Sequence, residues 1–361
     1  MRLRPALLAA SAMLAGSIFI ALPAWAAPYS ALYVFGDSLS DNGNLAEVFY
    51  RQNLPNPPSY NNSFTNGPVA AQLLANSYGL SLTPSLWVTG FQDSFNLFGG
   101  GAYTPGTNFA VAGATAAAGA VGGPPAINLP QQVAAFSLSS GFVADPNALY
   151  LVAIGGNDVR NAARQGTGAA AITAGVQAEV AAVGTLLAEG ARNLLVVNVP
   201  NVGAIPEFAL GSPALAPTAS LLTQAYNTGL ASGLAGLPLP PGASVIQFDL
   251  AAYDASLLAN GASYGLTDVT NPCYLGTPLS AATTPQCGPG ASNIDSLAFW
   301  DAIHPTAKVQ ALWAQGFEGA LAVKVPEPSS LALLATGLVG TAGLTRRRRK
   351  ATKVQAPGVQ A

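Results

Sequence analysis

The chain has 361 residues, of which half are hydrophobic and only 8% are charged. This composition argues against a disordered protein and against a nucleic-acid-binding protein, which would carry a basic face. The net charge of −2 is unevenly distributed, because residues 28–325 hold 6 basic and 15 acidic side chains, and the other basic residues lie near the two ends.

The N-terminus has the parts of a secretory signal peptide. Arg2 and Arg4 precede an apolar run over residues 7–22, and Ala24 and Ala26 form a small-x-small cleavage site. We therefore expect residues 1–26 to be a signal peptide rather than a first transmembrane helix, and the rest of the chain to be exported.

The only two cysteines, Cys273 and Cys287, lie in a segment rich in Pro, Gly and Thr. Export permits a disulfide, so we expect them to be paired and to close this loop. Two isolated cysteines make a poor zinc site, and no metal is expected.

Strands and helices alternate along the chain after this leader. An apolar run over residues 31–35 predicts a short buried strand that ends in a turn at Ser38. Further strands are expected at 107–111, 148–154, 193–199 and 244–250, and helices at 67–78, 130–138, 169–189, 217–234, 251–260 and 305–321. Residues 81–106, rich in Gly, Ser, Thr and aromatic residues, are expected to form either a lobe over the site or an ordinary surface loop.

The predicted strands are continuous apolar runs, which is typical of a parallel sheet covered by helices on both faces. The sequence therefore predicts one α/β domain over residues 28–323, with a five-stranded parallel sheet. No internal repeat and no second domain is visible in the sequence.

Ser38 is the first candidate for chemistry, because open α/β sheets keep their ligand sites at the carboxyl ends of their strands. A serine nucleophile needs a base, and the chain contains one histidine, His304. Asp301 precedes it by three residues, a spacing that puts both side chains on one side of a turn. The carboxylate then fixes the imidazole tautomer and leaves the other ring nitrogen free to take the serine proton.

Two more turns follow predicted strands and supply hydrogen-bond donors for an oxyanion. Gly113 allows close approach of its backbone N–H, because no side chain intervenes. Asn157 offers a side-chain amide, and the Ser38 N–H is a third donor. These groups are expected at the same edge of the sheet as Ser38, where acyl transfer needs them.

Two alternatives concern other residues. Ser263 lies in a Gly-x-Ser-x-Gly pattern, which marks the nucleophile in α/β-hydrolases. That elbow requires an apolar strand directly before it, whereas residues 251–260 predict a short helix. Asp37, Asp41 and Asp158 suggest a cation site, but they lie in different turns without ligand spacing, so hydrogen-bonded turn residues are expected.

Four blocks of the sequence resemble those of the GDSL, or SGNH, esterases and lipases: residues 35–44, 108–115, 155–158 and 301–306, with residues 64–68 similar to a segment of the lipase-like branch. The resemblance implies a flavodoxin-like three-layer α/β/α sandwich and hydrolysis of carboxylic esters without a cofactor. It implies that Ser38 is the nucleophile and that Asp301 orients the general base, His304. It also implies that Ser38, Gly113 and Asn157 form the oxyanion hole.

Residues 326–350 resemble the PEP-CTERM sorting signal of Gram-negative bacteria. A Pro-Glu-Pro motif at 326–328 precedes an apolar stretch at 329–345 and a basic cluster at 346–350. The apolar stretch is close to the length that spans a bilayer, and the basic cluster would stay cytoplasmic. The resemblance implies transient anchoring in the inner membrane and cleavage by an exosortase-like enzyme. A plain tail anchor that is never cleaved is the alternative.

Together these features predict a secreted serine ester hydrolase, an esterase or lipase, at the cell surface, in the extracellular matrix or in the medium. Its substrate is expected to be an ester of a lipid or of an acylated sugar, and the protein is expected to be a monomer. One alternative is an acyltransferase with the same site. Another is a non-catalytic surface or matrix protein on the same scaffold, which a fluorophosphonate probe would distinguish because it labels only an activated serine.

Overall fold

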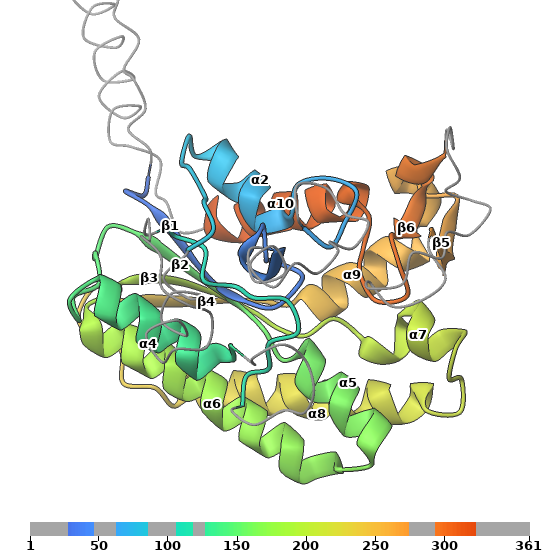
Figure 1. The fold of residues 1–361 in the computed structure, drawn as a ribbon, viewed down its shortest axis with the longest axis horizontal. Coiled ribbons are helices and arrows are strands. Elements are labelled where there is room, and N and C mark those ends of the chain that lie inside the picture. The colour runs from blue at the N-terminus through green and yellow to red at the C-terminus, as the bar shows by residue number, and fades with distance from the viewer. Residues whose placement is uncertain (1–27, 47–62, 86–105, 118–126, 274–292, 323–361) are drawn as a thin grey trace, which may run out of the picture.

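The computed structural model describes residues 28–46, 63–85, 106–117, 127–273 and 293–322. The expected signal peptide (1–26), most of the segment 81–106, and the expected sorting signal (326–350) lie outside the described residues. The described parts form one α/β unit (Figure 1).

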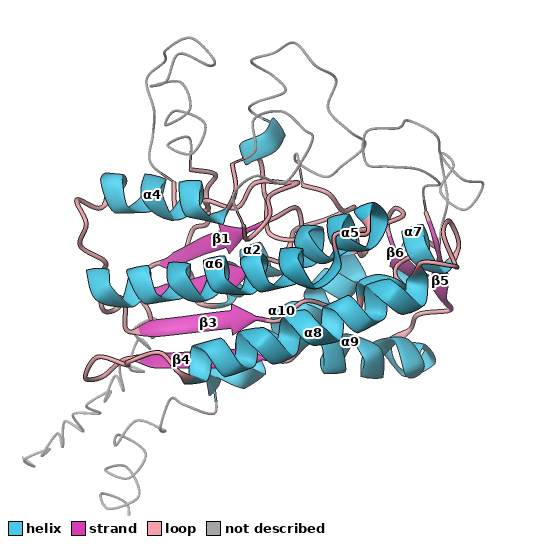
Figure 2. Ribbon diagram, turned by 90° about the horizontal axis from the view of Figure 1, so that it is seen from below, coloured by secondary structure: helices cyan, strands magenta, loops and turns pink. Residues whose placement is uncertain are grey.

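The main sheet contains four parallel strands in the order β1 (Leu32–Gly36), β2 (Leu149–Ala153), β3 (Asn193–Val197) and β4 (Ser244–Phe248). They pair in register, as Leu32 with Leu149 and Leu149 with Asn193. The common direction of β1 and β3 is visible in Figure 2. Such pairing requires crossover connections, which the helices supply.

The predicted strand at 107–111 lies alongside β1. The Val34 N–H donates to the Thr107 carbonyl at 3.0 Å, and the Phe109 N–H donates to the Val34 carbonyl at 2.7 Å, a parallel bridge centred on Asn108. The pairing continues with the Val111 N–H, which donates to the Gly36 carbonyl at 3.1 Å, but the ladder is irregular because the Gly36 N–H donates to Gln132, at 2.9 Å. With this segment included, the strand order is the flavodoxin-like 2-1-3-4-5.

Helices cover both faces of the sheet. Alternate strand residues face opposite sides, so Phe35 and Tyr150 lie in one core and Val34 and Leu151 in the other. The first core is closed by α4 (Leu129–Ser139), α5 (Gly156–Gln165), α6 (Gly168–Glu189) and α8 (Ala216–Ala235), and the second by α2 (Ala70–Ser77), α9 (Leu250–Ala259) and α10 (Ala307–Ala322) (Figure 1). The predicted three-layer α/β/α sandwich is confirmed.

Helix α5 is absent from the sequence prediction, which placed only a turn at residues 155–158. The turn forms, with Gly155 at a φ of 106°, where a Cβ would come within 2.5 Å of the Tyr226 ring. A helix then starts directly at Gly156 and buries Val159, Ala162 and Ala163. These three residues have helical spacing, but they are too few to stand out in a polar segment.

A small second sheet is also absent from the prediction. It pairs β5 (Asp268–Pro272) with β6 (Leu297–Phe299) in parallel. The remaining short elements are η1 (Val202–Ala204), α7 (Pro206–Ala209), η2 (Gly261–Tyr264) and η4 (Ile294–Ser296). β6 matters for function because it runs directly into the turn that carries Asp301 and His304.

In the part of the chain that the structure describes, α6 is the one helix long and apolar enough to cross a membrane. It packs against the sheet through Ile172, Val183 and Leu186, which are all buried. Its apolar composition is therefore explained by its place in the core.

Candidate active site

The structure brings Ser38, His304 and Asp301 together at the carboxyl ends of the strands. Ser38 Oγ lies 2.7 Å from His304 Nε2, and His304 Nδ1 lies 2.8 Å from Asp301 Oδ2. The three residues are only 9%, 2% and 4% exposed, in that order. Because Nδ1 faces a carboxylate, it carries the ring proton, and Nε2 accepts from the serine hydroxyl.

The turn that holds His304 is fixed by its own backbone. The Trp300 N–H donates to the His304 carbonyl at 2.8 Å. Asp301 Oδ1 accepts the N–H groups of Ile303 and His304, at 2.8 and 2.7 Å. The same carboxylate therefore closes the turn through Oδ1 and also faces the imidazole, with Oδ2 at 2.8 Å and Oδ1 at 3.0 Å from Nδ1, which explains the three-residue spacing.

Residues 64–68 pack behind this turn. The Phe64 ring lies 5.3 Å from the His304 ring, centroid to centroid. Asn66 Oδ1 accepts the Ala307 N–H at 2.7 Å, at the start of α10. A Cβ on Gly67 would come within 2.5 Å of the Ala307 side chain, so this close contact requires glycine.

The turn that carries Ser38 is held by buried polar groups. Asp37 Oδ1 accepts the Leu39 N–H at 3.0 Å. The Gln132 amide binds both backbone groups of Gly36, accepting its N–H at 2.9 Å and donating to its carbonyl at 2.8 Å. Gln132 is fully buried and comes from α4, so the strand end that presents Ser38 is fixed by a residue distant in sequence.

Asp41 joins the first block of the sequence to the second. Its carboxylate accepts four backbone N–H groups, those of Gly43, Asn44, Leu45 and Ala112. Because Ala112 directly precedes Gly113, this bond orients one of the expected oxyanion donors.

Asn44 and Asn108 add a second link between the two blocks. Asn44 Nδ2 donates to the carbonyls of Asn108 and Ala110, and Asn108 Nδ2 donates to the Ser40 carbonyl. The asparagines of both blocks thus act as structural cross-links.

Two of the three expected oxyanion donors, Gly113 and Asn157, meet at the turn at residues 112–114. Gly113 has a φ of 83°, and a Cβ on it would contact nothing within 4 Å, so glycine is required here for backbone conformation rather than for space. Asn157 Nδ2 donates to the Ala114 carbonyl at 2.9 Å, and its second hydrogen is left for another acceptor. Among the described residues, the backbone N–H groups of Ser38 and Gly113 have no acceptor.

Buried carboxyls lie beneath the site. Burial raises the pKa of Asp37 to about 6, against opposing effects of the Leu39 N–H and of the neighbouring His304. Burial likewise raises the pKa of Asp158 to about 6. Glu179 accepts the Tyr226 hydroxyl at 2.7 Å, and burial raises its pKa well above the usual value.

The acidic turn residues bind backbone rather than a cation. Asp158 accepts the N–H groups of Ala116 and Ala117, at 2.8 and 3.2 Å, as Asp37 and Asp41 accept those of their own turns. In the described parts of the chain, no group of three His, Cys, Asp or Glu side chains is placed to hold a metal ion.

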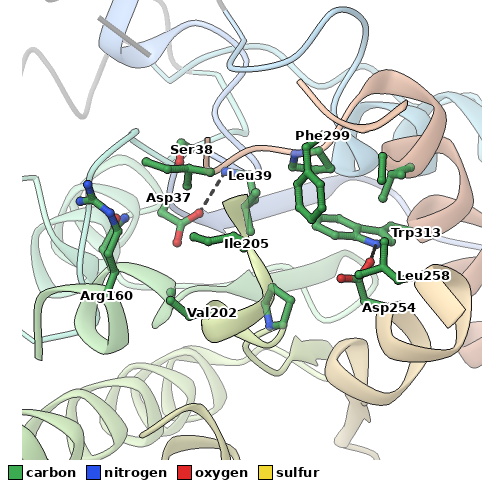
Figure 3. Close-up of a pocket in the computed structure, with 17 residues that line it drawn as sticks. Asp37, Ser38, Leu39, Arg160, Val202, Ile205, Asp254, Leu258, Phe299 and Trp313 are labelled. Carbon is green, nitrogen blue, oxygen red and sulfur yellow. Dashed lines mark hydrogen bonds between the residues drawn. The ribbon is translucent and has the colours of Figure 1, made fainter. Parts of the chain in front are cut away.

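A pocket that is partly open to solvent adjoins Ser38, and its space, with the open part included, is about 640 Å³. Most of its lining is apolar, as the side chains drawn in Figure 3 show: Leu39, Val202, Ile205, Leu258, Phe299, Ile303, Val309 and Trp313. Its polar lining residues include Asn157, Arg160 and Asp254. Arg160 is paired with Glu207, which also binds Arg164. Apart from Leu39 and Ile303, which lie in the recognised blocks, the sequence prediction missed these walls, because their residues carry no motif.

Two other residues singled out in the sequence, Ser263 and Cys273, take no part in the contacts of Ser38, His304 and Asp301. Ser263 is exposed on the surface turn η2, and its N–H donates to the Asn260 carbonyl, so no strand precedes it as an elbow requires. Cys273 is disulfide-bonded. Its expected partner, Cys287, lies outside the described residues, and the pairing of these two stays a prediction.

The chain matches the family model described as GDSL-like lipase/acylhydrolase over residues 32–317. It also matches the PEP-CTERM protein-sorting motif over residues 324–349, which indicates an exported protein. Both matches agree with the resemblances seen in the sequence.

Curated relatives cover most of the chain. An uncharacterized protein of Pseudomonas putida is 31% identical over 322 residues, which are 84% of this chain and 50% of that protein. Esterase EstA of Pseudomonas aeruginosa is 30% identical over 343 residues, 84% of this chain and 48% of the esterase. The chain thus spans about half the length of these relatives. A phosphatidylcholine-sterol acyltransferase of Aeromonas hydrophila is 27% identical over 325 residues, 78% of this chain and 87% of that enzyme.

Proposed function

Because the chain belongs to the GDSL-like lipase/acylhydrolase family, we propose that it is an exported serine hydrolase of carboxylic esters with Ser38 as its nucleophile. The observation that carries this proposal is the unbroken chain of hydrogen bonds from Ser38 through His304 to Asp301 at the mouth of an apolar pocket. An activated nucleophile, an oriented base and space for an acyl chain are what ester hydrolysis requires.

In the proposed reaction, Ser38 Oγ attacks the ester carbonyl carbon while its proton passes to His304 Nε2, 2.7 Å away. The N–H groups of Ser38 and Gly113 and the Asn157 amide stabilise the negative carbonyl oxygen. The intermediate collapses, and the alcohol leaves with the proton from His304, so that Ser38 carries the acyl group. Water then gives a proton to His304 and attacks the acyl carbon. The second intermediate collapses to the free acid, and the departing Ser38 Oγ takes the proton back from His304.

The substrate proposed is an ester of a lipid or of an acylated sugar. The apolar lining of the pocket supports an acyl chain on one side of the scissile bond. No cofactor takes part in the proposed steps.

The proposal is tested by the hydrolysis of p-nitrophenyl esters with acyl chains of two to twelve carbons. Ser38→Ala should lower kcat by roughly 10⁶-fold, because the nucleophile is lost. Ser263→Ala, which alters an exposed serine in the competing motif, should leave kcat unchanged. Hydrolysis that survives in Ser38→Ala, or no hydrolysis and no fluorophosphonate labelling by the wild-type protein, would refute the proposal and favour a displayed scaffold.

A second candidate is transfer of the acyl group from Ser38 to an alcohol instead of water. The similarity to the phosphatidylcholine-sterol acyltransferase, over 87% of that enzyme, supports acyl transfer as this second candidate. Addition of a long-chain alcohol or a sugar would produce new esters if transfer competes with hydrolysis, and only free acid if it does not.

We also propose that the chain divides into a signal peptide (1–26), a hydrolase domain (28–323) that acts as a monomer, and a sorting signal with a transmembrane segment (326–350). The match to the PEP-CTERM motif supports the last part. An exosortase-like enzyme would release the protein from the inner membrane to the surface, the matrix or the medium. The mass of the protein from a Gram-negative host with and without an exosortase would test this, and an unchanged mass would favour an uncleaved tail anchor.

A further inference from the structure

A carboxyl group lies in the apolar wall of the pocket that adjoins Ser38. Asp254 lines this pocket from helix α9, and its Oδ1 accepts the indole N–H of Trp313, from α10, at 3.0 Å. Figure 3 shows Asp254 at the opposite end of the pocket from Arg160, with Ser38 nearer to Arg160. Asp254 takes no part in the proposed steps at Ser38, so its presence in the wall needs another explanation.

The surroundings of Asp254 make a carboxyl costly there. Ile205 and Phe299 lie between it and Ser38, and Leu258 lies beside it (Figure 3). Burial raises its pKa to about 6, although the bond from Trp313 opposes this effect. Asp254 is half-buried, so an oxygen without a partner in the protein is left to solvent until a bound chain covers it, and it then needs a hydrogen-bond partner from that chain.

Only one of the two carboxyl oxygens has a hydrogen-bond partner among the described residues. Trp313 is the donor to Oδ1, and Oδ2 accepts no hydrogen bond from these residues. The second oxygen points away from the indole, toward the pocket (Figure 3). The open hydrogen-bonding position therefore faces the space in which the acyl chain would lie.

We infer that Asp254 determines substrate specificity by binding a hydroxyl group on the acyl chain, so that the preferred substrates are esters of hydroxylated acids. This inference rests on the proposed hydrolysis at Ser38 and names the substrate class of that site. Asp254 is held in place by Trp313 and contacts the substrate at a distance from the scissile bond.

A hydroxyl fits this position better than other groups. It both donates and accepts, so it pairs with Asp254 in the ionised and in the protonated form. An ammonium group would require the carboxylate and would bring a second charge into an apolar wall. An unsubstituted alkyl chain would cover Oδ2 and leave it without a partner, which lowers binding by roughly 10- to 100-fold.

The hydroxyl belongs to the acyl part rather than to the alcohol part of the ester. The arm of the pocket that leads to Asp254 is apolar, as an acyl chain requires. Arg160 lies at the other end of the pocket and is paired with Glu207 (Figure 3). A departing alcohol is better accommodated at that end.

The test compares pairs of p-nitrophenyl esters with the same chain length, one with a terminal hydroxyl and one without. The length runs from four to twelve carbons, so that the series scans the distance from Ser38 to Asp254. For the wild-type protein, kcat/KM should favour the hydroxylated ester by at least about tenfold at one length. Asp254→Leu should abolish this preference, because kcat/KM should fall for the hydroxylated ester and rise for the alkyl ester. The isosteric Asp254→Asn should retain part of the preference.

Leu258→Ala is the matched control, because Leu258 lies one turn further along α9 and lines the same pocket. It should shift the best chain length and keep the hydroxyl preference at that length. The fraction of Ser38 labelled by a fluorophosphonate verifies that each variant is folded.

Equal rates for both members of every pair, or a preference that persists in Asp254→Leu, would overturn the inference and leave ester hydrolysis standing. A preference that follows a hydroxyl on the alcohol part and depends on Asp254 would overturn the assignment to the acyl chain. A wild-type protein that cleaves no ester would instead overturn the proposed function, on which the inference depends.

Discussion

Replacement of Asp301 by asparagine should reverse the direction of the hydrogen bonds at His304. Asp301 Oδ1 accepts two backbone N–H groups, at 2.8 and 2.7 Å, so the amide oxygen of an asparagine would keep this place. The amide nitrogen would then take the place of Oδ2, which lies 2.8 Å from His304 Nδ1. The reverse orientation would give up both backbone bonds and is disfavoured.

The new NH₂ group donates at the closer position, 2.8 Å from His304 Nδ1, whereas the amide oxygen stays 3.0 Å from it. This favours the tautomer in which Nδ1 accepts and the ring proton lies on Nε2. Nε2 lies 2.7 Å from Ser38 Oγ and would then donate to the serine instead of receiving its proton. The expected loss in kcat is about 10⁴-fold, as for the same substitution in a serine protease triad. KM should change little, because no residue of the pocket wall is altered.

The assay is the steady-state hydrolysis of a p-nitrophenyl ester, with urea unfolding as a check on the fold. Asp268→Asn is the matched control, because Asp268 also accepts the N–H groups two and three residues ahead, at the start of β5, which does not line the pocket. This substitution should leave kcat within about twofold of the wild-type value. A loss below about tenfold for Asp301→Asn, with the fold intact, would show that Asp301 does not set the tautomer of His304.

Three further predictions concern Asn157, Gln132 and Asp254. Asn157→Ala should lower kcat by about 10²- to 10³-fold in ester hydrolysis, because it removes an oxyanion donor, and an unchanged kcat would exclude the amide from this role. Gln132→Leu should lower the free energy of unfolding by about 1–3 kcal/mol in urea denaturation, since it leaves the buried Gly36 N–H without an acceptor. A variant as stable as the wild type would mean that water replaces the Gln132 amide. Asp254→Asn should change the pH dependence of stability. Burial raises the folded pKa of Asp254 from 3.8 to about 6, so the stability that this carboxyl contributes is present below about pH 4 and is lost as the pH rises through 6. The variant should therefore gain about 1–3 kcal/mol over the wild type between pH 4 and pH 8, and parallel pH profiles would contradict this.

The sequence is sufficient to place the candidate active-site residues because of a general property of parallel sheets. Their strands end at one edge, so turns at Ser38, Gly113 and Asn157 had to meet. The spacing of Asp301 and His304 also has a local cause, since one carboxylate both closes the turn and faces the ring. Such features depend on residues near one another in sequence or on strand topology.

Features that depend on distant partners could not be predicted. Gln132 resembles any other polar helix residue until the fold places it on the Gly36 backbone. Asp254 likewise gains its meaning from Trp313 and from the pocket that α9 and α10 form with Ser38. The strand β6 was missed because three residues are too few to give a pattern, although it delivers His304 to the site.

Every step of the proposed hydrolysis depends on Ser38 as an activated nucleophile. We would therefore label the whole chain with a fluorophosphonate and locate the adduct by peptide mass spectrometry. We expect a single adduct on Ser38, lost in Ser38→Ala and strongly slowed in Asp301→Asn. An adduct on Ser263, or none on a folded protein, would contradict this expectation.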